Sequence, residues 1–291
     1  MGVLVTAACI VVCAAAAVAS QALRQRAETR PGSLDERLLA FQSEAVRGRI
    51  HLVVLLPHGY ARSGLRYSVV YFLHGLPAAS GSYQDVGFLR RALAEIGRPV
   101  ILVAPQGARD HDHDPEYLDW GPGRNWETAV SKELPAFVDS HFRTIRNRRG
   151  RGLVGLSAGG YGAVLLGLHH LDDFSVIESW SGYFHPTDAT GGSALDLRSS
   201  RRNRRASAHV FVGSLRRAFA ARPTFFAFYV GRGDARFRDE NLRLHRELVA
   251  ARVPHVFELY PGGHARTVWS RRARRWLGLA VAHLSRADPQ A

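Results

Sequence analysis

The chain has 291 residues, of which 46% are hydrophobic and 22% charged, a composition that supports one large core and excludes an intrinsically disordered protein. Its formal net charge is +14, and every one of its 39 basic residues except Lys132 is an arginine. We expect no specific nucleic-acid partner, because no nucleic-acid-binding motif accompanies the arginine clusters, although these clusters leave association with an anionic surface open.

The first 23 residues carry no charged side chain and are mostly apolar or small. The tripeptide Ala17-Val18-Ala19 has the small-x-small form of a signal-peptidase site, which predicts a signal peptide over residues 1–19 and export to the cell envelope or the medium. No Lys or Arg precedes the apolar run, so an uncleaved N-terminal anchor is the alternative. Both cysteines, Cys9 and Cys13, lie here, so we expect no disulfide or thiol nucleophile in the exported protein.

Beyond this segment, short apolar strands alternate with helices along the chain. In chain order we predict strands 39–46, 49–57 and 67–73, helix 83–97, strand 99–105, helix 126–142 with Asn125 as its N-cap, strand 151–156, helix 158–170, strand 174–180, helix 210–220, strand 225–230, helix 238–253, strand 255–260 and helix 265–284. This alternation predicts one α/β domain, with a mostly parallel sheet of about eight strands and helices on both faces. An Arg-rich insertion at about 185–208 is the one candidate for a small lid.

Ser157 lies between Gly155 and Gly159, after an apolar strand and before a helix. A nucleophile elbow has this context, because its strained turn exposes the serine and the glycines let strand and helix approach closely. An ordinary strand-helix turn is the alternative when the motif is taken by itself.

The residues downstream favour the nucleophile elbow. Asp234 follows the seventh predicted strand and His264 the eighth, which is the Ser, Asp, His order of the α/β-hydrolases. Because the carboxyl ends of parallel strands share one edge of a sheet, these side chains are expected to meet there. We expect His264 to take the proton of Ser157 and Asp234 to orient His264. Asp239 and Glu240 are alternatives for the acid, although both are expected within the next helix.

A tetrahedral intermediate needs two backbone N–H donors for its oxyanion. The sequence predicts Ala158, at the start of the helix, and Leu76, in the loop after the third strand, as these donors. His74 and Gly75 are expected to be structural, the glycine allowing a close backbone approach and the histidine bracing the loop.

A long polar loop after the fourth strand carries the sequence HDHD at residues 111–114. Neighbouring side chains rarely converge on one ion without a rigid scaffold, so we expect a solvated loop and no metal site. Trp120, Trp126 and Trp180 are expected either to line a pocket or to pack in the core.

Five stretches together resemble the "putative esterase" branch of the α/β-hydrolases, which includes S-formylglutathione hydrolases, feruloyl esterases and mycolyltransferases. The stretches are YSVVYFLHGLP, NWETAVSKELPAFVDSHF, GLSAGGYGA, GRGD and YPGGHARTVW, and the resemblance covers residues 38–284. It implies the α/β-hydrolase fold, a triad of Ser157, Asp234 and His264, and oxyanion donors at Leu76 and Ala158. The insertion at 185–208 departs from the pattern, so the resemblance does not indicate the acyl group.

We therefore predict an exported serine esterase that hydrolyses small-molecule or cell-envelope esters through an acyl-enzyme on Ser157, without a cofactor. The polar loops around the expected cleft favour hydrolysis and short to medium acyl chains. One alternative is an acyltransferase that passes the acyl group to a sugar or another alcohol. A catalytically silent protein that binds an anionic wall or nucleic acid is the other, and the three residues at matched strand ends disfavour it.

Overall fold

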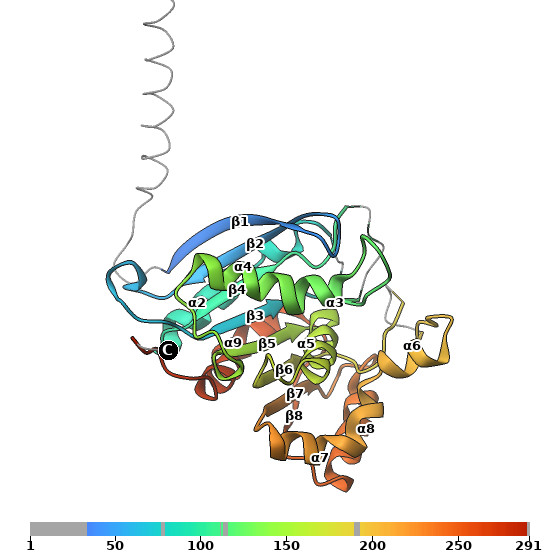
Figure 1. Ribbon diagram of the computed structural model, residues 1–291. Helices are drawn as coiled ribbons and strands as arrows, with labels where there is room; N and C mark the ends of the chain where they lie inside the picture. Colours follow the sequence, from blue (N-terminus) through green and yellow to red (C-terminus); the bar gives the residue numbers. More distant parts are fainter. Residues whose placement is uncertain (1–33, 77–78, 111, 113–115, 189–192, 290–291) are drawn as a thin grey trace, which may run out of the picture.

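An eight-stranded sheet between two layers of helices forms the centre of the computed structural model, which describes residues 34–76, 79–110, 112, 116–188 and 193–289 (Figure 1). The strand order is β1-β2-β4-β3-β5-β6-β7-β8. β1 (Asp35–Ser43) and β2 (Gly48–Leu56) form an antiparallel hairpin, and β2 also pairs antiparallel with β4. The remaining neighbours are parallel, namely β3 (Val69–Leu73), β4 (Ile101–Pro105), β5 (Arg151–Leu156), β6 (Val176–Trp180), β7 (Phe225–Gly231) and β8 (Val256–Tyr260).

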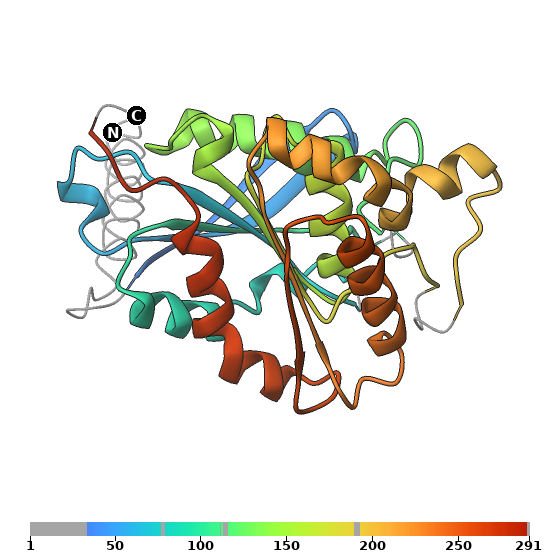
Figure 2. The same ribbon diagram turned by 90° about the horizontal axis from the view of Figure 1, so that it is seen from below.

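Helices cover both faces of the sheet, as the sequence predicts (Figure 2). One face carries α2 (Gly87–Ile96) and α9 (Arg266–Ala282). The other face carries α3 (Trp126–Thr128), α4 (Leu134–His141), α5 (Ala158–His169), α7 (Val212–Ala221) and α8 (Arg238–Ala250). Strand β3 has side chains in both cores, because Phe72 packs with α2 while Tyr71 packs on the opposite side. Burial on both faces explains why such strands are apolar throughout rather than alternating.

The first hairpin lies earlier in the chain than predicted. β1 begins at Asp35 and ends at Ser43, where the sequence indicates a strand over 39–46. Residues 44–47 form the turn instead, and the half-buried Glu133 carboxylate accepts a hydrogen bond from the Ala45 N–H at 3.0 Å. The apolar residues of this turn, Ala45 and Val46, pack in the core without belonging to a strand.

The predicted helix 126–142 is continuous but irregular. A π-helical segment, Ala129–Glu133, separates α3 from α4. Pro135 follows it closely, and a proline both lacks an N–H and crowds the carbonyl four residues before it, which here is that of Ser131. Asn125 does precede the helix, but its side chain accepts a hydrogen bond from the Gly121 N–H at 2.9 Å instead of capping it.

The Arg-rich insertion contains a short helix, α6 (Ser200–Arg205), and a bridge between Thr187 and Ala194. Figure 1 places α6 at one side of the molecule, beyond the ends of the strands. The predicted signal peptide at 1–19 lies outside the described residues. In the part of the chain that the structure describes, no helix is both long and apolar enough to cross a membrane.

Candidate active site

Ser157 occupies the sharp turn between β5 and α5. Its φ of 55° and ψ of −119° are a strained combination for a residue with a side chain. A Cβ at Gly155 would lie 1.8 Å from the carbonyl oxygen of Gly159, and one at Gly159 would lie 2.0 Å from that of Leu73. Both glycines are therefore required by the close approach of the helix to the strands, as the sequence pattern predicts.

His264 and Asp234 come to the same edge of the sheet from the loops after β8 and β7. His264 Nε2 lies 3.0 Å from Ser157 Oγ, and His264 Nδ1 lies 2.8 Å from Asp234 Oδ2. Asp234 is 2% exposed and Ser157 8% exposed, so this chain of hydrogen bonds is largely shielded from water. The structure thus brings together the three residues that the sequence places at separate strand ends.

The acid and the histidine are each positioned by further contacts. Asp234 Oδ1 accepts hydrogen bonds from the backbone N–H groups of Arg236 and Phe237, both at 3.3 Å. The imidazole of His264 packs edge to face with two aromatic rings, with the centroid of Phe237 at 5.2 Å and that of Trp269 at 4.8 Å. The ring of His264 therefore has little freedom to rotate.

Trp269 is itself anchored below the site. Its Nε1–H donates to Ser181 Oγ at 3.0 Å, and Ser181 Oγ is also hydrogen-bonded to the Tyr260 hydroxyl. These positioning residues are not among those that the sequence predicts for the site. Tyr260 and Trp269 lie at the two ends of the motif YPGGHARTVW, so their closeness to His264 in the sequence could have indicated a role near the site. Nothing in the sequence marks Ser181 or Phe237.

The loop after β3 passes directly over Ser157. A Cβ at Gly75 would lie 2.8 Å from the carbonyl oxygen of Leu156, so only glycine fits this approach. His74 braces the loop: its Nδ1 donates to the Gly75 carbonyl at 2.9 Å, while its Nε2 accepts from the Gly107 N–H at 3.0 Å. Burial lowers the pKa of His74 below its ordinary value, which favours the neutral ring that this pair of bonds requires.

The two residues predicted as oxyanion donors lie on either side of Ser157. Ala158 is the first residue of α5, where the N–H groups have no acceptor within the helix. Leu76 follows Gly75 in the overlying loop and lines the same cavity as Ser157. Donors from a helix N-terminus and from a neighbouring loop are the arrangement that stabilises a developing oxyanion in acyl transfer.

A cavity of about 360 Å³ opens over Ser157 and His264. Aromatic and aliphatic side chains form much of its wall, and the charged side chains of Asp85, Arg236 and Arg266 also line it. The lining residues other than those of the Ser157 site and its overlying loop are Phe72, Ser82, Asp85, Phe88, Leu156, Tyr183, Thr187, Arg236, Phe237, Arg266 and Trp269.

The model of a protein family described as "Putative esterase" matches residues 43–273. The chain belongs to this family. Membership confirms the resemblance seen in the sequence, and the matched residues include the whole site described above.

Relatives in the putative-esterase family match the chain in part. Esterase Rv1288 of Mycobacterium tuberculosis (strain ATCC 25618 / H37Rv) is 31% identical over 142 residues, which are 49% of this chain and 31% of that protein. The diacylglycerol acyltransferase/mycolyltransferase Ag85A of Mycobacterium leprae (strain TN) is 36% identical over 72 residues, which are 25% of this chain and 21% of that protein. The chain therefore spans less than a third of the length of these curated relatives.

Solved structures share the fold over most of the chain. A ferulic acid esterase superposes with a TM-score of 0.71 and 21% identity, covering 87% of this chain and 100% of its own. The S-formylglutathione hydrolase FrmB of Staphylococcus aureus gives a TM-score of 0.68 and 20% identity, covering 85% and 99%. MPT51 (FbpC1) of Mycobacterium tuberculosis gives 0.66 and 18%, covering 86% and 99%. The predicted α/β-hydrolase fold is confirmed.

The two carboxylates that the sequence offers as alternatives to Asp234 bond to other partners. Asp239 and Glu240 belong to α8, as expected. Asp239 is paired with Arg238, and Glu240 accepts a hydrogen bond from the Phe184 N–H at 3.0 Å. Neither side chain contacts His264 among the described contacts.

The three tryptophans that the sequence offers as pocket residues do not line the cavity over Ser157, and neither does Asp112 of the HDHD stretch. Trp126 and Trp180 are fully buried, and Trp120 lines a second, smaller cavity beside α6. Within the HDHD stretch, Asp112 accepts a hydrogen bond from Arg109 Nε at 3.0 Å, while residues 111, 113 and 114 lie outside the described residues.

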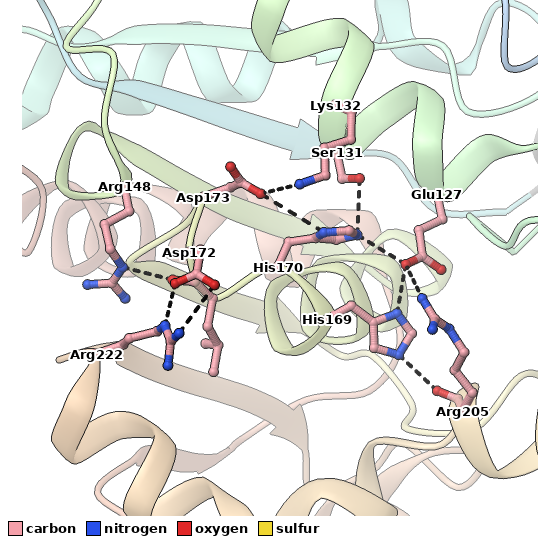
Figure 3. Close-up of polar contacts among 11 residues, drawn as sticks. Glu127, Ser131, Lys132, Arg148, His169, His170, Asp172, Asp173, Arg205 and Arg222 are labelled. Atoms are coloured by element: carbon pink, nitrogen blue, oxygen red, sulfur yellow. Dashed lines mark hydrogen bonds and ion pairs between the residues drawn. The ribbon is translucent and has the colours of Figure 1, made fainter.

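The described residues of the Arg-rich insertion, which is the candidate lid, lie mostly away from the cavity over Ser157. Of its described residues, Thr187 alone lines the cavity over Ser157, whereas Leu197, Arg202, Arg205 and Ala206 line the second cavity. Figure 3 shows how α6 is attached to the body of the protein, with Arg205 Nη2 3.2 Å from Glu127 Oε1. The same oxygen lies 2.8 Å from His169 Nδ1, and His169 Nε2 contacts the Arg205 carbonyl at 3.0 Å.

Proposed function

We propose that this chain is an exported serine esterase that hydrolyses carboxylic esters through an acyl-enzyme on Ser157. The observation that carries the proposal is the hydrogen-bonded chain from Ser157 Oγ to His264 Nε2, at 3.0 Å, and from His264 Nδ1 to Asp234 Oδ2, at 2.8 Å. A nucleophile, a base and an orienting acid at these separations have the geometry of a serine hydrolase. Membership in the putative-esterase family supports the same reaction class.

In the proposed acylation step, Ser157 Oγ attacks the ester carbonyl carbon while His264 Nε2 takes its proton. Asp234 accepts the Nδ1–H of His264, so Nε2 is the nitrogen with a free lone pair, and the carboxylate stabilises the imidazolium that forms. The N–H groups of Ala158 and Leu76 would receive the oxyanion. His264 then donates the proton to the leaving alcohol as the tetrahedral intermediate collapses to the acyl-enzyme.

Deacylation repeats the sequence with water. His264 removes a proton from the water molecule as its oxygen attacks the acyl carbon, and the second tetrahedral intermediate uses the same two N–H groups. When this intermediate collapses, Ser157 Oγ takes the proton back from His264 and the carboxylic acid leaves. No cofactor enters either half-reaction.

The test is Ser157→Ala, measured with p-nitrophenyl acetate and with a fluorophosphonate probe. Loss of a triad nucleophile lowers kcat on the order of 10⁶-fold, and the probe should no longer label the protein. Ser214→Ala is the matched control, because Ser214 is exposed on α7 and donates a hydrogen bond to the Phe211 carbonyl. Wild-type turnover in a folded Ser157→Ala variant would refute the proposal.

An acyltransferase is the second candidate, and the match to the mycolyltransferase Ag85A favours it. The two functions differ only in whether water or a bound alcohol attacks the acyl-enzyme. Product partitioning from an activated ester, with and without trehalose, glucose or glycerol, separates them. We expect the free acid to dominate, and transfer of most of the acyl group to an acceptor would replace the hydrolase proposal.

Export is proposed from the apolar segment at 1–19. Mass spectrometry of secreted protein should find a new N-terminus close to Ser20. An intact Met1 in the membrane fraction would instead indicate an uncleaved anchor.

A further inference from the structure

One side of the cavity over Ser157 is an apolar compartment. Its walls are Phe72 from β3, Phe88 from α2, Leu156 from β5 and Trp269 from α9. Phe72 and Phe88 are each 4% exposed, and their rings pack edge to face with centroids 5.9 Å apart. These tightly packed aromatic groups therefore limit the depth of the compartment.

The mouth of the same compartment is charged. Asp85 and Arg266 line the cavity together and are bonded to each other, Arg266 Nε donating to Asp85 Oδ2 at 2.7 Å. A second bond joins Arg266 Nη2 to Asp85 Oδ1, so the pairing is bidentate. The side chain of Arg266 is 57% exposed and that of Asp85 is 53% exposed, which places the pair at the outer rim and the aromatic groups beneath it.

This ion pair connects the two helices that enclose the compartment. Asp85 lies just before α2, and Arg266 is the first residue of α9. The guanidinium of Arg266 also lies 5.8 Å from the ring centroid of Phe88, so the pair reaches over the compartment wall. Figure 2 shows α2 and α9 together on one face of the sheet.

Resting on the proposed esterase function, we propose that the Asp85–Arg266 pair determines specificity, by limiting the compartment to a short apolar arm of the ester. A short arm is buried against the aromatic walls and gains the free energy of leaving water. A longer arm must pass the ion pair, where its methylene groups would strip water from two charges or force the pair apart. The preferred substrates are therefore esters in which one arm is short and apolar.

The test compares kcat/KM along two series, p-nitrophenyl esters from acetyl to decanoyl and acetate esters of alcohols of increasing length. Asp85→Ala and Arg266→Ala should each raise the ratio of long-chain to short-chain kcat/KM by about fivefold in one series, the size that an exposed ion pair allows. The double variant should equal the single ones, because either substitution removes the same pair.

The chain supplies a matched control. Glu95 and Arg274 form another exposed ion pair between α2 and α9, with Arg274 Nε 3.6 Å from Glu95 Oε2, and neither residue lines the cavity over Ser157. Glu95→Ala and Arg274→Ala should leave the length preference unchanged.

An unchanged preference in both Asp85 and Arg266 variants, in both series, would overturn the proposal. So would an equal shift in the control variants, because it would trace the effect to helix packing. If the wild-type protein hydrolysed no ester at all, the proposed function would fail first, and this outcome is distinct from an active enzyme with an unaltered preference.

Discussion

Asp234 illustrates how single residues of this site are held in place before any substrate binds. Its carboxylate accepts from two backbone N–H groups through one oxygen and from His264 through the other. Backbone donors are rigid, so the acid cannot rotate away from the imidazole. Two aromatic rings confine His264 in turn. The precision of the site comes from these neighbours as much as from the three side chains of the proposed triad.

At this scale we predict that Asp234→Asn lowers kcat for ester hydrolysis by about 10⁴-fold, because the amide favours the wrong tautomer of His264. Steady-state kinetics on p-nitrophenyl acetate measure the effect. Asp239→Asn and Glu240→Gln serve as controls and should change kcat far less. A greater loss at either control would transfer the role of the acid to that residue.

The Arg-rich insertion shows how one element is attached to the rest of the fold. It is fixed to α8 at both sides, because His185 at its start and His209 just after its end each pair with Glu240. Glu127 holds α6 through Arg205. Burial acts to raise the pKa of Glu127, but hydrogen bonds from His169 and His170 outweigh it and hold the pKa below its ordinary value. The carboxylate is therefore a charged anchor for the insertion.

Removing this anchor should release α6. Glu127→Gln leaves three cationic or donor groups around a neutral amide, and we expect a loss of about 3 kcal/mol in the free energy of unfolding. Limited trypsin digestion should then cleave within Arg201–Arg205 faster than in the wild type, because a protease cuts chain that is locally unfolded.

Asp172→Asn is the control for this experiment. Asp172 pairs with Arg222 close to the group formed by Glu127, His169, His170 and Arg205 (Figure 3). Its side chain is 77% exposed, so removing its charge should change the free energy of unfolding little. Equal digestion of the Glu127→Gln variant and the wild type would show that the insertion is held by other contacts.

The stability of the whole molecule depends on pH through glutamates whose pKa values are shifted in opposite directions. Burial raises the pKa of Glu178 to about 8, against hydrogen bonds from Trp180 and Tyr229. The stability that this group contributes is complete below its unfolded pKa and is lost as the pH rises through the folded value. The pKa values of Glu127 and Glu240 are lowered, so their contribution is present above the unfolded value and is lost as the pH falls.

We therefore expect the melting temperature of the protein to decline on both sides of a mildly acidic optimum. Glu178→Gln should remove much of the alkaline decline, because the amide keeps an acceptor for Trp180 and cannot ionise. Calorimetry at intervals from pH 5 to 9 should show the variant gaining on the wild type as the pH rises to about 8. A constant difference across this range would mean that Glu178 does not titrate there.

Most of the fold could be predicted from local patterns, and the errors in the prediction lie where packing against distant residues or a proline changes the local structure. Strands buried on both faces have short apolar runs, and β5 begins and ends at the predicted residues. The apolar pattern of the turn at 44–47 predicts a strand because Ala45 and Val46 pack in the core, although the backbone there forms a turn whose Ala45 N–H bonds to the distant Glu133. The π-helical segment before Pro135 also lies within a pattern that favours an ordinary helix.

The sequence by itself determined the elbow around Ser157, because a strained turn between strand and helix requires glycines at fixed spacing. It also placed Asp234 and His264 at strand ends that share an edge. Only the tertiary structure decided which distant groups surround them: the ring of Phe237 beside His264 and the Asp85–Arg266 pair come from segments far apart in the chain. Such pairings follow from how helices pack on the sheet, and no local spacing in the sequence records them.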